Sequence, residues 1–546
     1  MKSALPLLSV LAWGMLCYPA AAQKSVLPVR FANGSAVKTL DFHKTSWMAD
    51  FRVIEGVFEG LFSNGPNAEI LPGVAHYPAT ISDDKLTWTF HLRKDATWSN
   101  GDPVTANDFL FAWNRVLDPA TASDYASLLY FIEGAEACHK ARSEGRPVDF
   151  STVAVRAPDP HTLVVRLVAP TPFFDELCAF PTFFPLNPRV MQRYALPHRP
   201  GDYDPRWATA GHLVGNGPFL LEEWQRDVRI VLRRRSDYWD AANTASDTII
   251  VLESGDPAQN FAAYENNHVD ILPNKPSKLV SRELMRQRLA GRRNDVHPVL
   301  NFGTYYFIFN CRQPPFDDAR VRRAFSHSAP RALLVSRFLA TGERPTNLFV
   351  PPETRGYTSP PGIAYDVELA RKLLAEAGYP GGAGFPNVKF IFNTEGGIHQ
   401  DIATVMQRAW LDALGVRIQL EPGMLRAQFS QARKGRQFNM ARGGWYGDYD
   451  DPMTFLDMFI TDGGNNDGGF SSSEYDRLIA EARLEIDPAR REKLLQQAEH
   501  LLINVEAAII PLFQYADINL FDPDRIKGFI PNRRHQNPFK YIYRVR

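Results

Sequence analysis

The segment from residue 388 to residue 420 limits the fold of this chain more than any other part of the sequence. Residues 388–392 form a short apolar run typical of a strand, and residues 402–414 have the apolar spacing of a helix that stops at Gly415. Residues 416–420 form a second strand-like run. Because a strand, a helix and a strand in succession favour a parallel sheet, the sequence predicts an α/β fold.

Strands and helices are mixed along the rest of the chain as well. Thr105 and Asp108 form a capping box at the start of one helix, and Asp318 is the expected N-cap of another. Apolar runs, alternation or a tight turn between two runs predict strands at residues 29–32, 86–92, 219–224 and 228–233. Helical spacing and stop signals predict further helices at residues 367–377, 474–486 and 488–503.

Length and charge describe a globular protein of several lobes. A chain of 546 residues exceeds what one hydrophobic core usually serves, so we expect two or three lobes. The 61 basic residues (Lys and Arg) equal the 61 acidic residues (Asp and Glu), and removal of Lys2 with a leader gives 60 − 61 = −1. Such a balance excludes the basic footprint of a nucleic-acid-binding or membrane-surface protein.

The N-terminus has the three-part plan of a secretory signal. Lys2 provides a minimal basic region, residues 5–19 are mostly apolar, and three alanines at 20–22 precede Gln23. The apolar stretch is too short to span a bilayer comfortably. We therefore expect a signal peptide over residues 1–22 that is cleaved at its end, and export of the mature protein.

Motifs of common reactions are missing from the sequence. There is no HExxH zinc helix, no GxxxxGK[ST] phosphate loop and no GxSxG nucleophile elbow, and the 13 histidines are scattered. Beyond the leader, Cys138, Cys178 and Cys311 have the spacing of neither a zinc site nor a dithiol pair. One disulfide is compatible with export, but three small buried residues are the simpler interpretation. We expect a binding protein rather than an enzyme, with no metal and no cofactor.

The most unusual segment runs from Arg442 to Pro452 and has the sequence RGGWYGDYDDP. Its two adjacent glycines let another backbone approach closely, and its Trp and two Tyr residues supply apolar walls with polar groups. Asp451 before a proline is typical of a helix N-cap, and Asp450 is interpreted as a solvated neighbour. Asp448 lies among aromatic residues, either as a turn residue or as an anion that meets a cation in a partly dry cleft.

Seven segments follow one another in a specific order. They are TLDFHK (39–44), FEGL (58–61), FHLRKDATWSNGDPVTA (90–106), GNGPF (215–219), DYWD (237–240), PPFDDARVR (314–322) and GWYGDYDDP (444–452). With these segments in this order, the chain resembles the oligopeptide-binding proteins of bacterial ABC importers, the extracellular solute-binding protein family 5. The resemblance covers the sequence from residue 29 to residue 546.

The resemblance implies a type II periplasmic binding protein, in which two hinge-linked lobes with mixed sheets and an extra domain enclose an extended peptide. A discontinuous lobe I is expected at residues 23–60, 213–302 and 518–546. The extra domain is expected at residues 61–212, and the second ligand-binding lobe at residues 303–517. Closure of the two lobes around the ligand is the implied conformational change.

In the family that this chain resembles, an aspartate holds the peptide ammonium and protein strands pair with the peptide main chain. Asp448 matches the aspartate. The strand that pairs with the peptide matches Gly444, Trp445 and Tyr446, and a strand on the other side of the peptide matches Ser46 to Met48. Side-chain or carboxylate pockets match Tyr125, Tyr306, His399, Arg442 and Arg433. Main-chain pairing holds any peptide sequence, and a charge-assisted ammonium contact adds about 1.5–3 kcal/mol.

Departures from the family pattern bear on specificity. A disulfide known in the family would join positions that are Gly303 and Tyr446 here, so that bridge cannot form, and Tyr446 is expected to narrow the adjacent pocket. Acidic pocket residues are replaced by Ile308 and Ser46. These two replacements predict that basic side chains of the peptide are less favoured here than in the family member that has the acidic residues.

The sequence thus predicts a non-enzymatic, monomeric receptor in the periplasm. It is expected to capture short peptides and deliver them to an ABC permease with its ATPase in the membrane, without contact to nucleic acid. Within the same fold, dipeptides, murein peptides, haem, nickel chelates and oligosaccharides are alternative ligands. A peptide sensor or chaperone would use the same cleft without an importer, and a hydrolase would cut its bound peptide.

Overall fold

The computed structural model describes residues 27–199, 201–273, 278–394 and 398–545, so the expected signal peptide at 1–22 lies outside the described residues. Within this part of the chain, an eleven-stranded mixed sheet connects the two halves of the molecule. The strand order is β15 (Ile418–Leu420), β14 (Val388–Ile391), β16 (Met440–Tyr446), β12 (Val296–Phe309), β17 (Ile509–Phe521), β11 (Ile271–Leu272), β1 (Val29–Ala32), β10 (Thr248–Leu252), β9 (Arg229–Arg234) and β8 (Phe219–Gln225), with β13 (Arg344–Pro345) beside β17.

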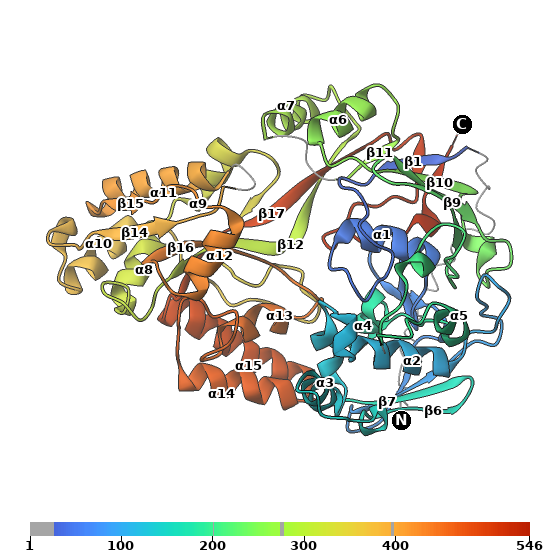
Figure 1. Cartoon of the computed structure of the whole chain (residues 1–546). Helices are drawn as coiled ribbons and strands as arrows, with labels where there is room; N and C mark the ends of the chain where they lie inside the picture. The colour runs from blue at the N-terminus through green and yellow to red at the C-terminus, as the bar shows by residue number, and fades with distance from the viewer. Residues whose placement is uncertain (1–26, 200, 274–277, 395–397, 546) are drawn as a thin grey trace, which may run out of the picture.

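The molecule has three parts, two of which share this sheet (Figure 1). Lobe I carries β1, β8–β11, β18 (Ile526–Lys527) and β19 (Tyr543–Arg544), with helices α1 (Met48–Val57), α6 (Pro257–Glu265) and α7 (Lys278–Leu289). The peripheral region below it carries β2 (Phe62–Asn64), β3 (Ile70–Pro72), β4 (Thr80–Ile81), β5 (Thr87–His91), β6 (Val155–Asp159), β7 (Thr162–Arg166), α2 (Ala106–Val116), α3 (Ala135–Ser143), α4 (Phe174–Cys178) and α5 (Pro188–Arg193). Lobe II carries β13–β16, α8 (Ala319–His327), α9 (Arg331–Leu333), α10 (Val367–Glu376), α11 (His399–Leu414), α12 (Arg426–Lys434), α13 (Met453–Leu456), α14 (Ser473–Leu484) and α15 (Pro488–His500).

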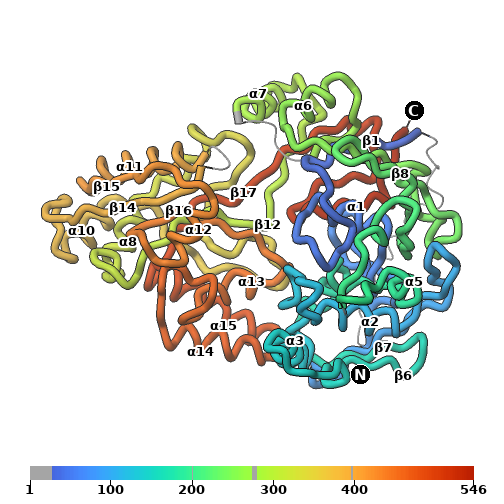
Figure 2. The backbone as a smooth tube through the Cα atoms, viewed as in Figure 1, coloured from blue at the N-terminus to red at the C-terminus, as the bar shows by residue number. Residues whose placement is uncertain are grey.

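Strands β12 and β17 run side by side between the two lobes (Figure 2). Their antiparallel pairing is interrupted between Leu300 opposite Ala516 and Thr304 opposite Gln514. Irregular pairing is where a β-ribbon bends most readily. The lobes are therefore joined through a point of reduced sheet regularity, and the predicted domain boundary between residues 302 and 303 falls inside it.

The parallel unit predicted for lobe II is present. Strand β14 pairs with β15 in parallel, and α11 connects them and ends at Gly415, whose φ of 70° suits a glycine. Helices α8 and α11 contact each other where the indole N–H of Trp410 donates to the carbonyl of Phe325 at 3.1 Å. The apolar side chains between these helices and the sheet are fully buried, which is the main source of stability for such a layer.

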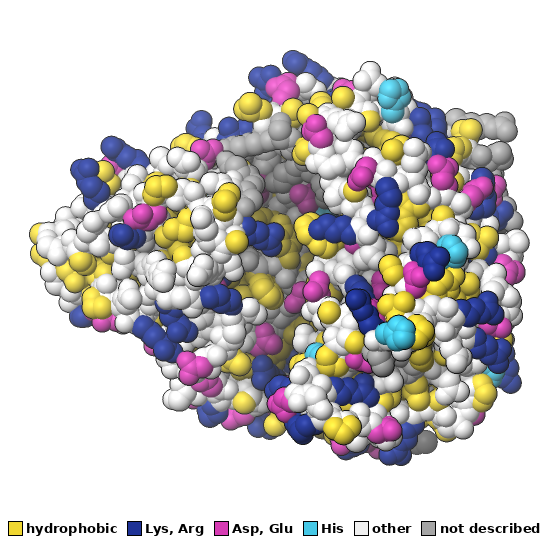
Figure 3. Space-filling view, in the orientation of Figure 1, with side chains coloured by type: hydrophobic (Ala, Val, Ile, Leu, Met, Phe, Trp, Pro, Cys, Tyr) yellow, Lys and Arg dark blue, Asp and Glu magenta, His cyan; other side chains and the backbone are white. Residues whose placement is uncertain are grey.

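The peripheral region begins with the predicted capping box. The Thr105 N–H donates to the Asp108 carboxylate at 2.9 Å, and the reciprocal bond completes the box at the start of α2. The alternating segment predicted at 86–92 is strand β5, which lies in the four-stranded sheet β4-β5-β7-β6. Figure 3 shows a hollow between lobe II on the left and the other two parts on the right.

Candidate functional site

One edge of strand β16 is open where the strand enters the space between the lobes. β16 pairs with β12 along its whole length. On its other side, β14 pairs with Met440 and Ala441 and then ends. Within the described residues, no strand pairs with this side from Arg442 to Tyr446. Their outward backbone N–H and C=O groups are therefore available to an added strand.

The two glycines of β16 make room for a tyrosine of the adjacent strand β12 and for one of the next strand, β17. A β-carbon at Gly443 would lie 2.5 Å from the ring of Tyr306, and one at Gly444 would lie 2.1 Å from the hydroxyl of Tyr515. Residues 442, 444 and 446 share one face of the strand. Tyr515 consequently fills the place beside Gly444 and stacks on Tyr446 with ring centroids 4.7 Å apart. The glycines thus set the packing of this strand, a role that sequence reasoning did not assign to them.

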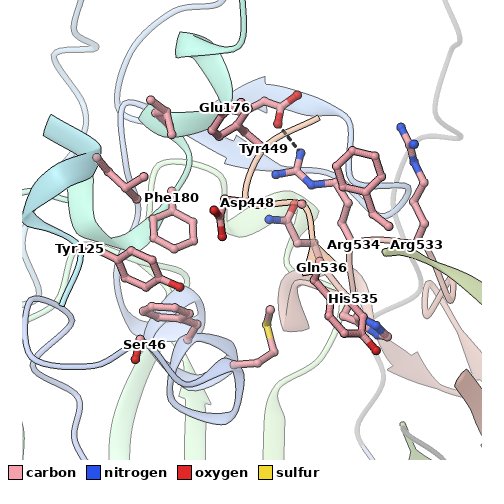
Figure 4. A pocket seen from close by; sticks show the side chains of 17 residues that line it. Ser46, Tyr125, Glu176, Phe180, Asp448, Tyr449, Arg533, Arg534, His535 and Gln536 are labelled. Atoms are coloured by element: carbon pink, nitrogen blue, oxygen red, sulfur yellow. Dashed lines mark ion pairs between the residues drawn. The ribbon is translucent and has the colours of Figure 1, made fainter. Parts of the chain in front are cut away.

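A cavity of about 240 Å³ lies at the end of β16 (Figure 4). All three parts of the molecule contribute to its walls. The lining residues include Ser46, Met48 and Phe51 from lobe I, Tyr125, Glu176 and Phe180 from the peripheral region, Tyr446 and Asp448 from lobe II, and Arg533, Arg534, His535 and Gln536 near the C-terminus. Figure 4 shows the Asp448 carboxylate directed into the space between Phe180, Tyr125 and Gln536.

Asp448 carries a solvent-accessible carboxylate in this confined space. Its backbone N–H donates to the hydroxyl of Thr454 at 3.1 Å, whereas in the described part of the chain no basic side chain pairs with its carboxylate. The pocket walls displace much of the surrounding water, and this desolvation raises the pKa of Asp448 to about 6. A carboxylate held in this way gains more from a bound cation than one in open solvent.

The loop that carries Asp448 is anchored to the peripheral region. Tyr449 stacks on Phe173 with ring centroids 3.8 Å apart and an interplanar angle of 7°. The Asp450 N–H donates to Glu176 at 2.8 Å, and the Asp450 carboxylate forms an ion pair with Arg533. The interpretation of Asp450 as a solvated neighbour is therefore wrong, because its side chain is 13% exposed and bridges two parts of the molecule.

Asp451 was predicted to be the N-cap of a helix, but the N-cap of α13 is the next residue, Pro452; the Asp451 side chain nevertheless contacts the start of this helix. Its carboxylate accepts a hydrogen bond from the Met453 N–H at 2.9 Å and pairs with Arg491 at 2.8 Å. Asp450 and Asp451 thus both have cationic partners. Of the three acids in this loop, Asp448 is the one whose carboxylate faces the cavity without such a partner among the described residues.

A second cavity, of about 740 Å³, lies along the outer side of β16. Its lining includes His399, Arg433, Arg442, Gly444, Trp445, Tyr446 and Tyr515. The Arg442 guanidinium donates to Nε2 of His399 at 3.1 Å, and the Tyr305 hydroxyl lies 3.2 Å from Nδ1 of the same ring. Within the described residues no carboxylate pairs with Arg442, so its charge faces the cavity uncompensated.

Arg433 differs from Arg442 in its electrostatics. It forms an ion pair with Asp467 at 2.5 Å, and Lys434 contacts the same carboxylate at 3.2 Å. Arg433 lines the second cavity, as the resemblance implied, but a buried carboxylate already compensates its charge. Arg442 is therefore the better placed of the two to meet an anion.

Other positions implied by the resemblance lie elsewhere than expected. Tyr306 and Ile308 are buried in the core, because β12 lies between two strands and is covered on both faces. Neither side chain is among those that line the two cavities. Ser46 and Met48 line the first cavity but form no strand, since residues 45–47 belong to no helix or strand and α1 begins at Met48. Trp47 has an extended backbone, with φ −98° and ψ 127°, and residues 46–47 belong to no strand.

Several cavity residues were not predicted from the sequence, among them Tyr515 and residues 533–536. Tyr515 lies in the middle of β17, where nothing in the local sequence distinguishes it from its apolar neighbours. Residues 533–536 (RRHQ) are a polar cluster close to the C-terminus, which is a signal that could have been noticed. Arg534 pairs with Glu176 at 2.7 Å (Figure 4), so this cluster joins the first cavity to the peripheral region.

The positions matched to the family disulfide face each other. Gly303 lies directly opposite Tyr446 in the β12–β16 ladder, and a β-carbon on Gly303 would lie 2.9 Å from the Tyr446 ring. A tyrosine over a glycine replaces the bridge here. The described cysteines, Cys138, Cys178 and Cys311, are all free.

Two further features concern the described residues alone. No cluster of three or more His, Cys, Asp or Glu side chains among them could hold a metal ion. None of their helices is both long enough and apolar enough to cross a bilayer. Two lobes joined by a continuous sheet flank cavities that contain the Asp448 carboxylate, the Arg442 guanidinium and a free strand edge, and this arrangement is typical of a ligand-binding protein.

Comparison with known proteins agrees with this class. A model of the family described as bacterial extracellular solute-binding proteins, family 5 Middle, matches residues 69–467. The chain belongs to this family, which confirms the resemblance, the fold class and the expectation of a binding protein rather than an enzyme.

Individual relatives align over nearly the whole chain. The sequence is 32% identical to the periplasmic oligopeptide-binding protein OppA of Escherichia coli (strain K12), over 90% of this chain and 88% of that protein. It is 33% identical to the dipeptide-binding protein DppE of Bacillus subtilis (strain 168), over 92% and 88%. The unliganded open form of MppA, a periplasmic murein tripeptide binding protein, superposes with a TM-score of 0.82 at 30% identity, over 96% of this chain and 98% of that one.

Proposed function

We propose that this protein is the receptor of an ABC importer and captures short peptides in extended conformation. The observation that carries the proposal is the open edge of β16, which ends beside the unpaired carboxylate of Asp448. A free strand edge binds any peptide main chain, and an anion at its end recognises the one charge that every unmodified peptide carries at its N-terminus.

The bound peptide would lie between β16 and residues 46–47, of which Trp47 has an extended backbone. Its ammonium would contact Asp448, with the Tyr125 ring as a wall of the same cavity, and its main chain would pair with Gly444, Trp445 and Tyr446. With the ammonium fixed there, the peptide runs toward Arg442. The Arg442 guanidinium pairs with no carboxylate among the described residues and donates a hydrogen bond to His399, so it is placed to bind a carboxylate of the peptide. Asp448 at one end of the β16 edge would thus meet the positive N-terminus of the peptide, and Arg442 at the other end would meet a negative group.

The relatives support peptides over the alternative ligands. The names of OppA, DppE and MppA assign oligopeptides, dipeptides and a murein tripeptide to those proteins. A sugar would stack on aromatic rings such as Trp445 but would have no use for the Asp448 charge.

We also propose the lobe boundaries at 302/303 and 517/518, because the interruption of the β12–β17 ladder lies at the first and within three residues of the second.

Main-chain pairing with β16 can be tested with backbone-modified peptides. N-methylation removes an amide donor and adds bulk at the strand edge while leaving both terminal charges intact. We expect the series of singly N-methylated tetra-alanines to include at least one peptide whose affinity falls by about tenfold or more, because a lost hydrogen bond and a steric conflict coincide there. Isothermal titration calorimetry measures the affinities.

The same series carries its own control. Methylation of an amide that faces away from β16 should change the affinity much less, so the losses should differ between positions. Uniformly unchanged affinity across the series would exclude strand addition as the mode of binding, and no binding of any unmodified peptide would exclude the proposed function itself.

Export and delivery to a permease are also part of the proposal. Relatives such as OppA are named as periplasmic, and residues 1–22 have the plan of a cleaved signal. In the native host, deletion of residues 1–22 should abolish uptake of a labelled peptide that depends on this protein, and the full chain should restore it. Uptake that persists with the truncated chain would contradict the exported location.

A further inference from the structure

Tyr446 presents a planar surface between the two cavities. It lines both of them, and its side chain is 50% exposed. One ring face is covered by Tyr515, with a centroid distance of 4.7 Å and an interplanar angle of 13°. An edge of the ring lies over Gly303, where the nearest ring atom would be 2.9 Å from a β-carbon. The other ring face is consequently the part that is open to the cleft.

The neighbouring residues hold this ring in a fixed orientation. Tyr515 is itself packed edge-on against Tyr305 and Phe513, with centroid distances of 5.9 Å and 5.8 Å. Gly444 leaves the space that the Tyr515 hydroxyl occupies. The exposed face of Tyr446 is therefore the end of a preorganised aromatic stack, and a ligand that continues the stack loses little conformational entropy of the protein.

We propose that this receptor prefers peptides with an aromatic side chain at the first or second residue, and that this ring stacks on Tyr446. The inference rests on the proposed function, since it assumes that the ammonium is at Asp448. Tyr446 is two residues from Asp448 along the chain, and an extended peptide advances about 3.3 Å per residue. The side chain of the first or second peptide residue thus lies beside the Tyr446 ring.

Stacking and simple apolar burial predict different preferences. A phenylalanine and a cyclohexylalanine side chain bury similar apolar area, but only phenylalanine has a π face that prefers an offset stack. Aromatic pairs gain stability beyond area burial, so the phenylalanine peptide should bind about three- to tenfold more tightly than its cyclohexylalanine match. Recognition by apolar burial alone would make the two peptides equal.

The test compares tripeptides that place phenylalanine, cyclohexylalanine, alanine or arginine at the first, second or third residue. Calorimetry should give the phenylalanine advantage over cyclohexylalanine at the first or second residue and not at the third. In Tyr446→Leu that ratio should fall to one, and in Tyr446→Phe it should persist. Tyr365→Leu, an exposed tyrosine outside both cavities, should change neither the ratio nor the affinity.

The possible results separate this inference from the proposed function. Equal affinities of the phenylalanine and cyclohexylalanine peptides in the unaltered protein, or an arginine peptide that binds more tightly than the phenylalanine peptide, would overturn the aromatic preference while peptide binding stands. Failure of every tripeptide to bind would overturn the proposed function. The comparison in the unaltered protein needs no variant, so it remains decisive if Tyr446→Leu does not fold.

Discussion

Asp448→Asn is expected to weaken binding of an unmodified peptide at least tenfold. The substitution keeps the size of the side chain but removes the negative charge that faces the first cavity without a cationic partner among the described residues. A charge-assisted hydrogen bond in such a place contributes about 1.5–3 kcal/mol, which corresponds to roughly ten- to a hundredfold in affinity. N-acetylation of the peptide removes the other member of the pair and should cost the unaltered protein a similar factor.

The two changes should not add. Because both delete one contact, Asp448→Asn should bind the free and the acetylated peptide with nearly equal affinity, and calorimetry of the four combinations gives the coupling directly. Folding of the variant can be checked independently. The pKa of Asp448 is raised in the folded protein, so its ionised form opposes folding at neutral pH, and the thermal midpoint of unliganded Asp448→Asn should be no lower than that of the unaltered protein. Additive losses would show that Asp448 does not contact the ammonium.

Peptide affinity should also fall steeply in mild acid. The pKa of Asp448 is about 6 in the unliganded protein, and only the ionised carboxylate attracts an ammonium. Affinity should be highest near pH 7, because the α-amino group of a peptide, with a pKa of about 7.7–8.0, loses its positive charge above that pH. Below about pH 6 each unit should cost up to about tenfold, because binding must then displace a proton from Asp448. Calorimetry in buffers of different ionisation enthalpy would also count the released proton.

Several other groups around the cavity can titrate or carry charge. They are Tyr125 and Glu176 in the peripheral region, Arg533, Arg534 and His535 near the C-terminus, and Asp457, whose pKa is raised to about 6 by burial. Protonation of His535 or Asp457 would also disfavour a bound cation. Asp448→Asn separates these contributions, since it should retain the weak dependence due to the neighbours and lose the steep part. An unchanged acid dependence in that variant would assign the titration to another group.

Local patterns in the sequence predicted most of the elements that position the site. The 388–420 segment, the alternating 86–92 strand and the capping box at Thr105 all depend on neighbours within a few residues, and all are present. The helix predicted to begin at residue 402 begins at His399 instead. The residue at which a helix begins depends on contacts that a local sequence pattern does not contain. Here His399, the first residue of α11, accepts a hydrogen bond from Arg442 of strand β16.

The sequence predicted the arrangement of the candidate site less well than it predicted the individual helices and strands. The family resemblance selected Asp448 and Arg442, and the structure places both in cavities that flank the open edge of β16. Tyr515, in contrast, meets Tyr446 from 69 positions further along the chain, and Asp450 meets Glu176 across 274 positions. Such contacts follow from the register of the large sheet and from the docking of the peripheral region, neither of which a single sequence reveals.

Mass spectrometry of the ligand retained by this protein after purification from its native host would test the central claim most directly. An open strand edge that ends at an uncompensated carboxylate should hold short peptides with unmodified α-amino groups. Recovery of a sugar, a metal chelate or exclusively N-blocked molecules would contradict that account of the cleft.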